Sequence, residues 1–139
     1  QKTAYEIGVR LVGSEMCIRD RVGGLLNGKE NGMKFLMLVC GDPSGPEPDR
    51  EDDLDPQPWV DEMDGRGIRL FGDRLAPAQS ATTVRVREGK VMLTDGPFAE
   101  TAELIGGFDL LECADLDEAI AVAAAHPMAR FGQLEVRPL

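Results

Sequence analysis

Gly107-Phe-Asp-Leu-Leu-Glu-Cys113 begins the stretch that decides the fold. It runs almost directly into the second half of that stretch, Asp115-Leu-Asp-Glu-Ala-Ile-Ala-Val-Ala123. Its first half is a short apolar run and predicts a strand. Its second half predicts a helix, because Asp115 and Glu118 have the spacing of a capping box. Apolar residues recur in it at helical spacing and predict a buried stripe: Leu116, Ala119, Ile120 and Ala123. Pro127 ends the helix, and Gln133–Pro138 predicts a final strand.

A hairpin precedes this strand–helix–strand unit. Ala81–Arg87 alternates cleanly, with Val84 and Val86 on one side and polar residues on the other. Glu88-Gly89 is the signal of a two-residue turn, and Lys90–Thr94 predicts the returning strand.

An earlier strand–helix–strand unit completes the pattern. Met33–Cys40 is a nearly continuous apolar run and predicts a central strand. Asp55-Pro56 begins a short helix, which ends at Gly65, and Ile68–Leu75 contains the next strand. The buried face of the helix is expected to hold Trp59, Val60 and Met63.

The order of elements, without the hairpin, is strand, helix, strand, strand, helix, strand. It predicts a ferredoxin-like α+β fold with an inserted β-hairpin. We expect the first and third core strands to be parallel neighbours. Cys40 and Cys113 each end one of them, so they should lie near one another as small buried hydrophobic residues.

The first 32 residues differ from the rest. Residues 1–32 hold five basic and four acidic side chains, whereas the chain from Met33 holds ten basic and 21 acidic ones. Tyr5–Arg21 resembles a translated sequencing-adapter sequence, and a genuine amphipathic arm is the alternative. We therefore expect residues 1–32 to be a non-native or disordered leader and residues 33–139 to form the domain.

Composition limits the partners. The formal net charge is −10, which argues against direct binding of nucleic acid or of an anionic membrane surface. No apolar run approaches the roughly 20 residues that a membrane span needs. The three cysteines have no metal spacing and the chain has one histidine, so we expect reduced thiols, a cytoplasmic protein, no metal and no cofactor.

Asp95 is the sharpest candidate for chemistry, in Asp95-Gly96-Pro97-Phe98. Two interpretations stand. The carboxylate points into a pocket where Phe98 desolvates it and raises its pKa, or it caps backbone amides in an ordinary Asp-Gly-Pro turn.

Four other residues carry similar alternatives. His126 is either a general base or a helix-terminal cap. Arg85 and Arg87 either clamp an anionic ligand or form the solvated face of the hairpin. Trp59 is either a pocket wall or a core residue.

The order of several blocks resembles the DGPF branch of the YCII-related family across Met33–Leu139. The blocks are Met33–Leu38, Gly72–Pro77, Ala81–Arg87, Thr94-Asp-Gly-Pro-Phe-Ala-Glu-Thr101, Ile105-Gly-Gly-Phe108 and Glu135–Pro138. The resemblance implies a bacterial protein with a dimeric α+β barrel and a pocket beside Asp95. Smaller relatives have been proposed to use a His–Asp pair, but Trp59–Gly67 contains no His, so only the Asp carries over.

The resemblance also suggests two functions. One is a homodimeric domain that binds a small molecule, with Asp95 and His126 as catalytic candidates for proton abstraction, elimination or isomerisation. Arg85, Arg87, Phe98 and Trp59 would then line the pocket. The other is a regulatory protein that contacts an extracytoplasmic-function sigma factor, because such relatives are often encoded beside one.

Overall fold

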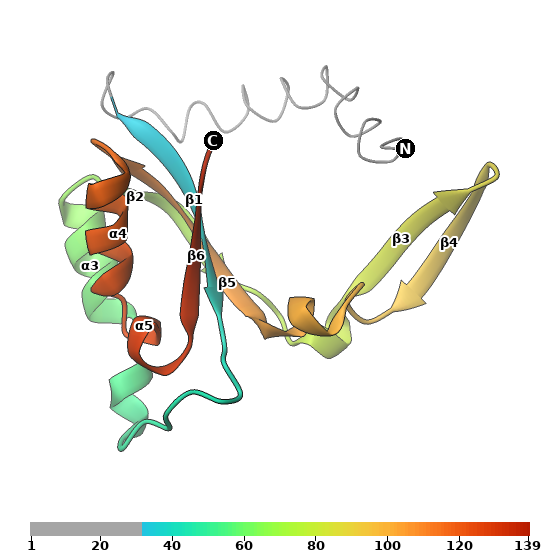
Figure 1. Ribbon diagram of the computed structural model, residues 1–139, viewed down its shortest axis with the longest axis horizontal. Helices are drawn as coiled ribbons and strands as arrows, with labels where there is room; N and C mark the ends of the chain where they lie inside the picture. The colour runs from blue at the N-terminus through green and yellow to red at the C-terminus, as the bar shows by residue number, and fades with distance from the viewer. Residues whose placement is uncertain (1–31) are drawn as a thin grey trace.

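The computed structural model describes residues 32–139 (Figure 1). The expected leader, residues 1–32, therefore lies outside the described residues except for Gly32.

A four-stranded sheet forms the centre of the domain. Its strands are β1 (Met33–Cys40), β2 (Arg69–Arg74), β5 (Ile105–Cys113) and β6 (Gln133–Pro138), in the order β2-β5-β1-β6. Each neighbouring pair is antiparallel. This order interleaves the two strand–helix–strand units, so the prediction of a ferredoxin-like α+β fold is confirmed.

The expected position of the two cysteines was wrong. β1 and β5 are neighbours but antiparallel, with Met33 opposite Cys113 and Cys40 opposite Ile105. Each helical crossover returns its second strand parallel to its first with one strand between them, and that middle strand must run the other way. Cys40 and Cys113 therefore lie at opposite ends of the sheet.

The helices α3 (Gln57–Gly65), α4 (Leu116–Ala124) and α5 (Met128–Phe131) cover one face of the sheet (Figure 1). α4 begins as the capping box predicts, because Asp115 Oδ1 accepts a hydrogen bond from Glu118 N at 2.9 Å. Short 3-10 turns lie at Glu51–Leu54, Ala78–Ser80 and Glu100–Leu104. Within residues 32–139, the helices are all too short or too polar to cross a membrane.

The core lies between the sheet and the helices. Phe35 and Met37 of β1 face it, together with Leu111 of β5. The stripe expected on α4 was partly wrong: Ala119 and Ala123 are buried, but Leu116 and Ile120 are about half exposed. The small alanines and Val122 face the sheet instead, which turns the two larger residues toward the edge of the helix.

The predicted hairpin consists of β3 (Thr82–Arg87) and β4 (Lys90–Asp95), which form a separate two-stranded sheet. Glu88 and Gly89 both have positive φ, of 52° and 77°, as the tightest hairpin turns require. The hairpin projects away from the rest of the domain (Figure 1).

Candidate functional site

His126 sits in the connection between α4 and α5. It is 5% exposed, although it is polar. Its Nδ1 accepts a hydrogen bond from Met128 N at 3.0 Å. Because Nδ1 is the acceptor, the ring proton of the neutral imidazole lies on Nε2. Burial lowers the pKa of His126 to about 4, so the ring is neutral at physiological pH.

Trp59 on α3 holds the imidazole in place. The two rings meet edge to face, with centroids 4.7 Å apart and planes at 65°. Trp59 Nε1 donates to Val122 O on α4 at 2.9 Å, which fixes the indole. Trp59 is therefore a core residue that also lines a cavity.

Two cavities meet at His126. The minor cavity, of about 410 Å³, lies between α3 and the end of α4 and is lined by acidic side chains of the 51–55 turn. The major cavity, of about 860 Å³, lies over the β1, β2 and β5 ends of the sheet. Among the described residues, only His126 lines both.

A buried ion pair lies in the wall of the major cavity. Arg69 Nε donates to Asp109 Oδ1 at 2.7 Å, its Nη1 donates to Asp64 Oδ1 at 3.1 Å, and its Nη2 donates to Gly72 O at 2.9 Å. Asp109 is 6% exposed. Burial raises the pKa of the Asp109 carboxyl above its usual value, and the hydrogen bond and charge of Arg69 offset part of that rise.

Gly72 makes room for this carboxylate. A Cβ at position 72 would lie 2.0 Å from Asp109 Oδ1 and 2.6 Å from Phe108 O, so no larger residue fits without a shift. The other carboxylate oxygen, Oδ2, has no hydrogen bond among the described residues and is not sealed from the cavity. A buried, partly unpaired carboxylate in a cavity wall is a candidate functional group.

Arg74 and Cys40 also line the major cavity. Arg74 is exposed, so its guanidinium can reach an anionic group at the cavity mouth. Burial, with Glu135 as a second cause, raises the pKa of the Cys40 thiol. Cys40 therefore stays protonated and is a poor nucleophile.

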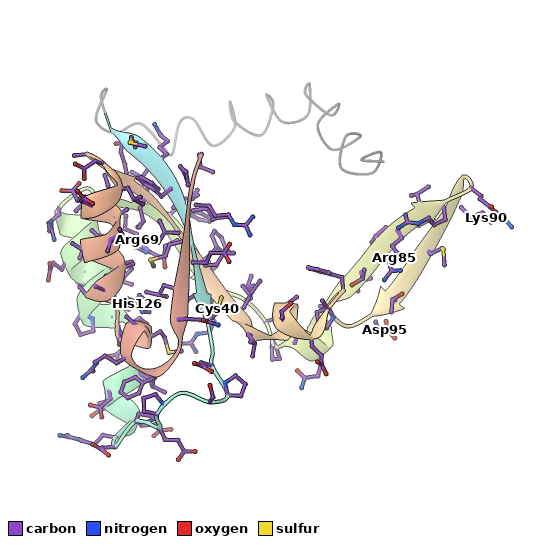
Figure 2. All side chains as sticks on the ribbon, in the orientation of Figure 1. Cys40, Arg69, Arg85, Lys90, Asp95 and His126 are labelled. Carbon is purple, nitrogen blue, oxygen red and sulfur yellow. The ribbon has the colours of Figure 1, made fainter. Side chains whose placement is uncertain are left out.

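The other residues singled out in the sequence lie on or beside the hairpin. Figure 2 places Asp95 at the foot of the hairpin and His126 in the helical layer, so the two do not pair within one chain. Asp95 is exposed, and Phe98 is 72% exposed. Arg85 and Arg87 point to the opposite side of the hairpin from Asp95, since Asp95 is paired with Thr82 across the strands.

The roles of these hairpin residues stay predictions. Gly96 has a positive φ, of 95°, a conformation that glycine adopts readily in such a turn. Thr83 Oγ1 donates to Gly96 O at 2.8 Å and holds the turn against the hairpin. No hydrogen bond to the Asp95 carboxylate exists among residues 32–139, so that carboxylate is available to a partner surface.

Sequence reasoning missed Arg69 and Asp109. A signal for Asp109 was present: it occupies an inward position on β5, between Gly107 and Leu111, where an unpaired acid is costly. The described part of the chain holds no cluster of three or more His, Cys, Asp or Glu side chains arranged to bind a metal ion.

Comparison with known proteins gives one family and one relative. The model of the YCII-related domain family matches residues 33–139. An uncharacterised protein of Rhizobium meliloti (strain 1021) is 47% identical over 70 residues, which are 48% of this chain and 55% of the relative. The chain thus spans about half the length of the curated relative that it matches.

Proposed function

The chain belongs to the YCII-related domain family, and from this premise we propose that it is a homodimeric domain that binds a small organic molecule in the major cavity. One observation carries the proposal: His126 and the Arg69–Asp109 pair, all largely buried, line the same cavity of about 860 Å³. Small-molecule sites are usually cavities of about 300–1,000 Å³ with a few convergent polar groups.

The polar groups suit a molecule that carries a carbonyl and an acid group. The neutral His126 ring has its proton on Nε2 and can donate it to a carbonyl oxygen. Asp109 Oδ2 can accept a proton, and Arg74 can bind a carboxylate at the mouth.

The reaction class that this arrangement favours is proton abstraction beside a carbonyl, as in an isomerase or lyase. A carboxylate of raised pKa serves as the base, and a neutral imidazole stabilises the oxyanion that develops. His126 is then a hydrogen-bond donor and not the general base, because Nδ1 is already occupied by Met128 N.

We expect small aromatic acids and lactones to raise the melting temperature of the full chain. We also expect replacement of Arg74 by alanine to weaken the binding of the acids about tenfold. Isothermal titration measures the affinity. Arg130→Ala is the matched control, since Arg130 is also an exposed arginine but lines the minor cavity. Equal losses in both variants would count against the major cavity as the site.

The homodimer is supported by the sheet face that the helices leave open. Leu36 and Leu38 of β1 lie opposite Leu110 and Phe108 of β5 on this face, and Phe71 packs on Phe108 with ring centroids 5.7 Å apart. We define these five residues as the open apolar face. A domain of this size gains a larger share of buried surface by pairing such faces.

A sigma-factor partner is the second candidate. It is favoured by the net charge of −10 and by the acidic turn at Glu51–Leu54, which offers a surface for a basic protein. Capture of an extracytoplasmic-function sigma factor by the tagged full chain should weaken steeply between low and physiological salt. A variant with Glu51, Asp52 and Asp53 changed to their amides should capture less sigma factor. Unchanged capture by this variant would contradict a contact through the acidic turn.

A further inference from the structure

The guanidinium of Arg69 is shared between three acceptors on three elements. Nε donates to Asp109 Oδ1 on β5 at 2.7 Å. Nη1 donates to Asp64 Oδ1 on α3 at 3.1 Å, and Nη2 donates to Gly72 O on β2 at 2.9 Å. The Arg69 side chain is largely buried, so these three contacts together fix the plane and direction of the guanidinium.

This arrangement gives Asp109 a single hydrogen bond to its cation. Pairs of arginine and carboxylate are frequently bidentate, with both carboxylate oxygens on the guanidinium. Here Asp64 and Gly72 O occupy the two Nη atoms, and only Nε serves Asp109. Asp109 Oδ2 is therefore left open to the major cavity, without a hydrogen bond among residues 32–139.

The presence of Asp64 is not explained by the stability of its helix. It lies in the last turn of α3, where the negative end of the helix dipole disfavours an acid. Its side chain is about half exposed, and ion pairs of such exposure contribute little to stability. Both of its oxygens lie near Arg69 Nη1, with Oδ2 at 3.5 Å. Its main effect is therefore on where the guanidinium of Arg69 points.

We propose that Asp64 is a positioning residue of the major cavity, which holds the guanidinium of Arg69 so that Asp109 Oδ2 stays free for a ligand. This inference rests on the function proposed above, in which Asp109 Oδ2 accepts a proton from the ligand. Without Asp64, Nη1 loses its carboxylate partner, and the guanidinium turns to bind both oxygens of Asp109. The base is then occupied by its own cation.

The same contacts set the electrostatics around Asp109. Burial is the largest cause that raises the pKa of its carboxyl, the hydrogen bond and charge of Arg69 lower this pKa, and the charge of Asp64 raises it again. Among the described residues, the wall of the major cavity holds four further titratable side chains: Cys40, Asp73, Arg74 and His126. Loss of Asp64 therefore lowers the pKa of Asp109, both by removing a negative charge and by allowing a second bond from Arg69.

The test compares two exposed acids near this pair. Asp64→Ala removes the carboxylate bound to Arg69. Asp73→Ala is the matched control, because Asp73 lies in the same cavity wall but its carboxylate accepts from Arg74 N and has no ion pair with Arg69. Asp64→Glu keeps the charge and an acceptor and is the conservative rescue. Both positions are exposed, so none of these changes should unfold the domain, which circular dichroism and thermal melting check.

Crystal structures of the variants show the contact directly. We expect both Asp109 oxygens to lie within hydrogen-bond distance of the guanidinium in D64A, and Oδ2 to stay open in D73A and D64E. A guanidinium that keeps its place in D64A, with Oδ2 still unbonded, overturns the proposal. A second bond that forms equally in D73A also overturns it, because loss of any nearby charge would then be the cause.

A carbon-13 NMR titration of the carboxyl groups gives a second readout in solution. The Asp109 signal is assigned with Asp109→Asn. The pKa of Asp109 should be lower in D64A than in the unaltered chain, and D64E should restore it. Equal pKa values in D64A and D64E overturn the positioning role.

Neither readout needs a ligand, so the inference and the proposed function fail separately. Titration of the unaltered chain with benzoate tests binding. A second bond in D64A without any binding of benzoate supports the role of Asp64 in holding Arg69 and counts against the proposed function. Binding of benzoate together with an unchanged Asp109 in D64A overturns the positioning role alone.

Discussion

Replacing Arg69 with methionine should lower the free energy of unfolding by about 3–5 kcal/mol at pH 7, because it leaves a buried carboxylate without its cation. Asp109 is 6% exposed, and Arg69 Nε is the group that donates to its Oδ1. Methionine retains much of the apolar stem of arginine but has no charge, so the change isolates the electrostatic part. Urea denaturation at equilibrium measures the loss.

The pH dependence of this loss has a definite sign. Without Arg69, the pKa of Asp109 rises further, because burial raises it and Arg69 is the group that lowers it. A carboxyl whose pKa is higher in the folded than in the unfolded state destabilises the fold as pH rises through that interval. The deficit of R69M relative to the unaltered chain should therefore shrink between pH 7 and pH 4.

A double variant separates the charge from the packing. R69M combined with Asp109→Leu removes the orphaned carboxylate and should recover most of the lost stability, because leucine branches at the same atom as aspartate and a hydrophobic pair often replaces a buried ion pair at little cost. If R69M and the double variant are equally unstable at every pH, the uncompensated charge is not the cause.

Local signals in the sequence predicted most of the secondary structure. The Asp115 and Glu118 spacing, the Glu88-Gly89 turn and the alternation of Val84 and Val86 each act over a few residues, and the structure contains all three features. The direction of β5 relative to β1 was predicted wrongly. It depends on how two distant units interleave, which no local pattern encodes.

The candidate site was less predictable for a related reason. Arg69 and Asp109 are 40 positions apart, and the register of β2 on β5 that places Arg69 opposite Leu111, and so diagonal to Asp109, is a long-range property. The apolar pattern predicted the strand β5, but it did not identify Arg69 as the partner of Asp109, the acid that points inward from this strand. The candidates on the hairpin were easier to see because Asp95-Gly96-Pro97 is a local motif, and their roles stay predictions.

His126 should lose its proton near pH 4 and not near its ordinary pKa of 6.5. The chain has a single histidine, so an NMR titration of its imidazole is unambiguous once any purification tag has been removed. Long-range proton–nitrogen correlations at pH 7 should also place the proton on Nε2, because Nδ1 accepts from Met128 N. An imidazole that titrates near 6.5, or one protonated on Nδ1, would contradict the buried geometry.

The depressed pKa has a consequence for stability. The folded state takes up the His126 proton at about pH 4 and the unfolded chain at about 6.5. The unfolded state therefore binds more protons between these values, so stability is complete above about pH 6.5 and falls as the solution becomes more acidic. The difference between these two pKa values corresponds to about 3 kcal/mol of the free energy of unfolding.

The variant His126→Asn tests this dependence. Asparagine keeps an acceptor for Met128 N but cannot titrate. The stability deficit of this variant relative to the unaltered chain should therefore narrow by about that amount between pH 7 and pH 4. A deficit that stays constant with pH would show that the buried ring contributes through packing against Trp59 alone.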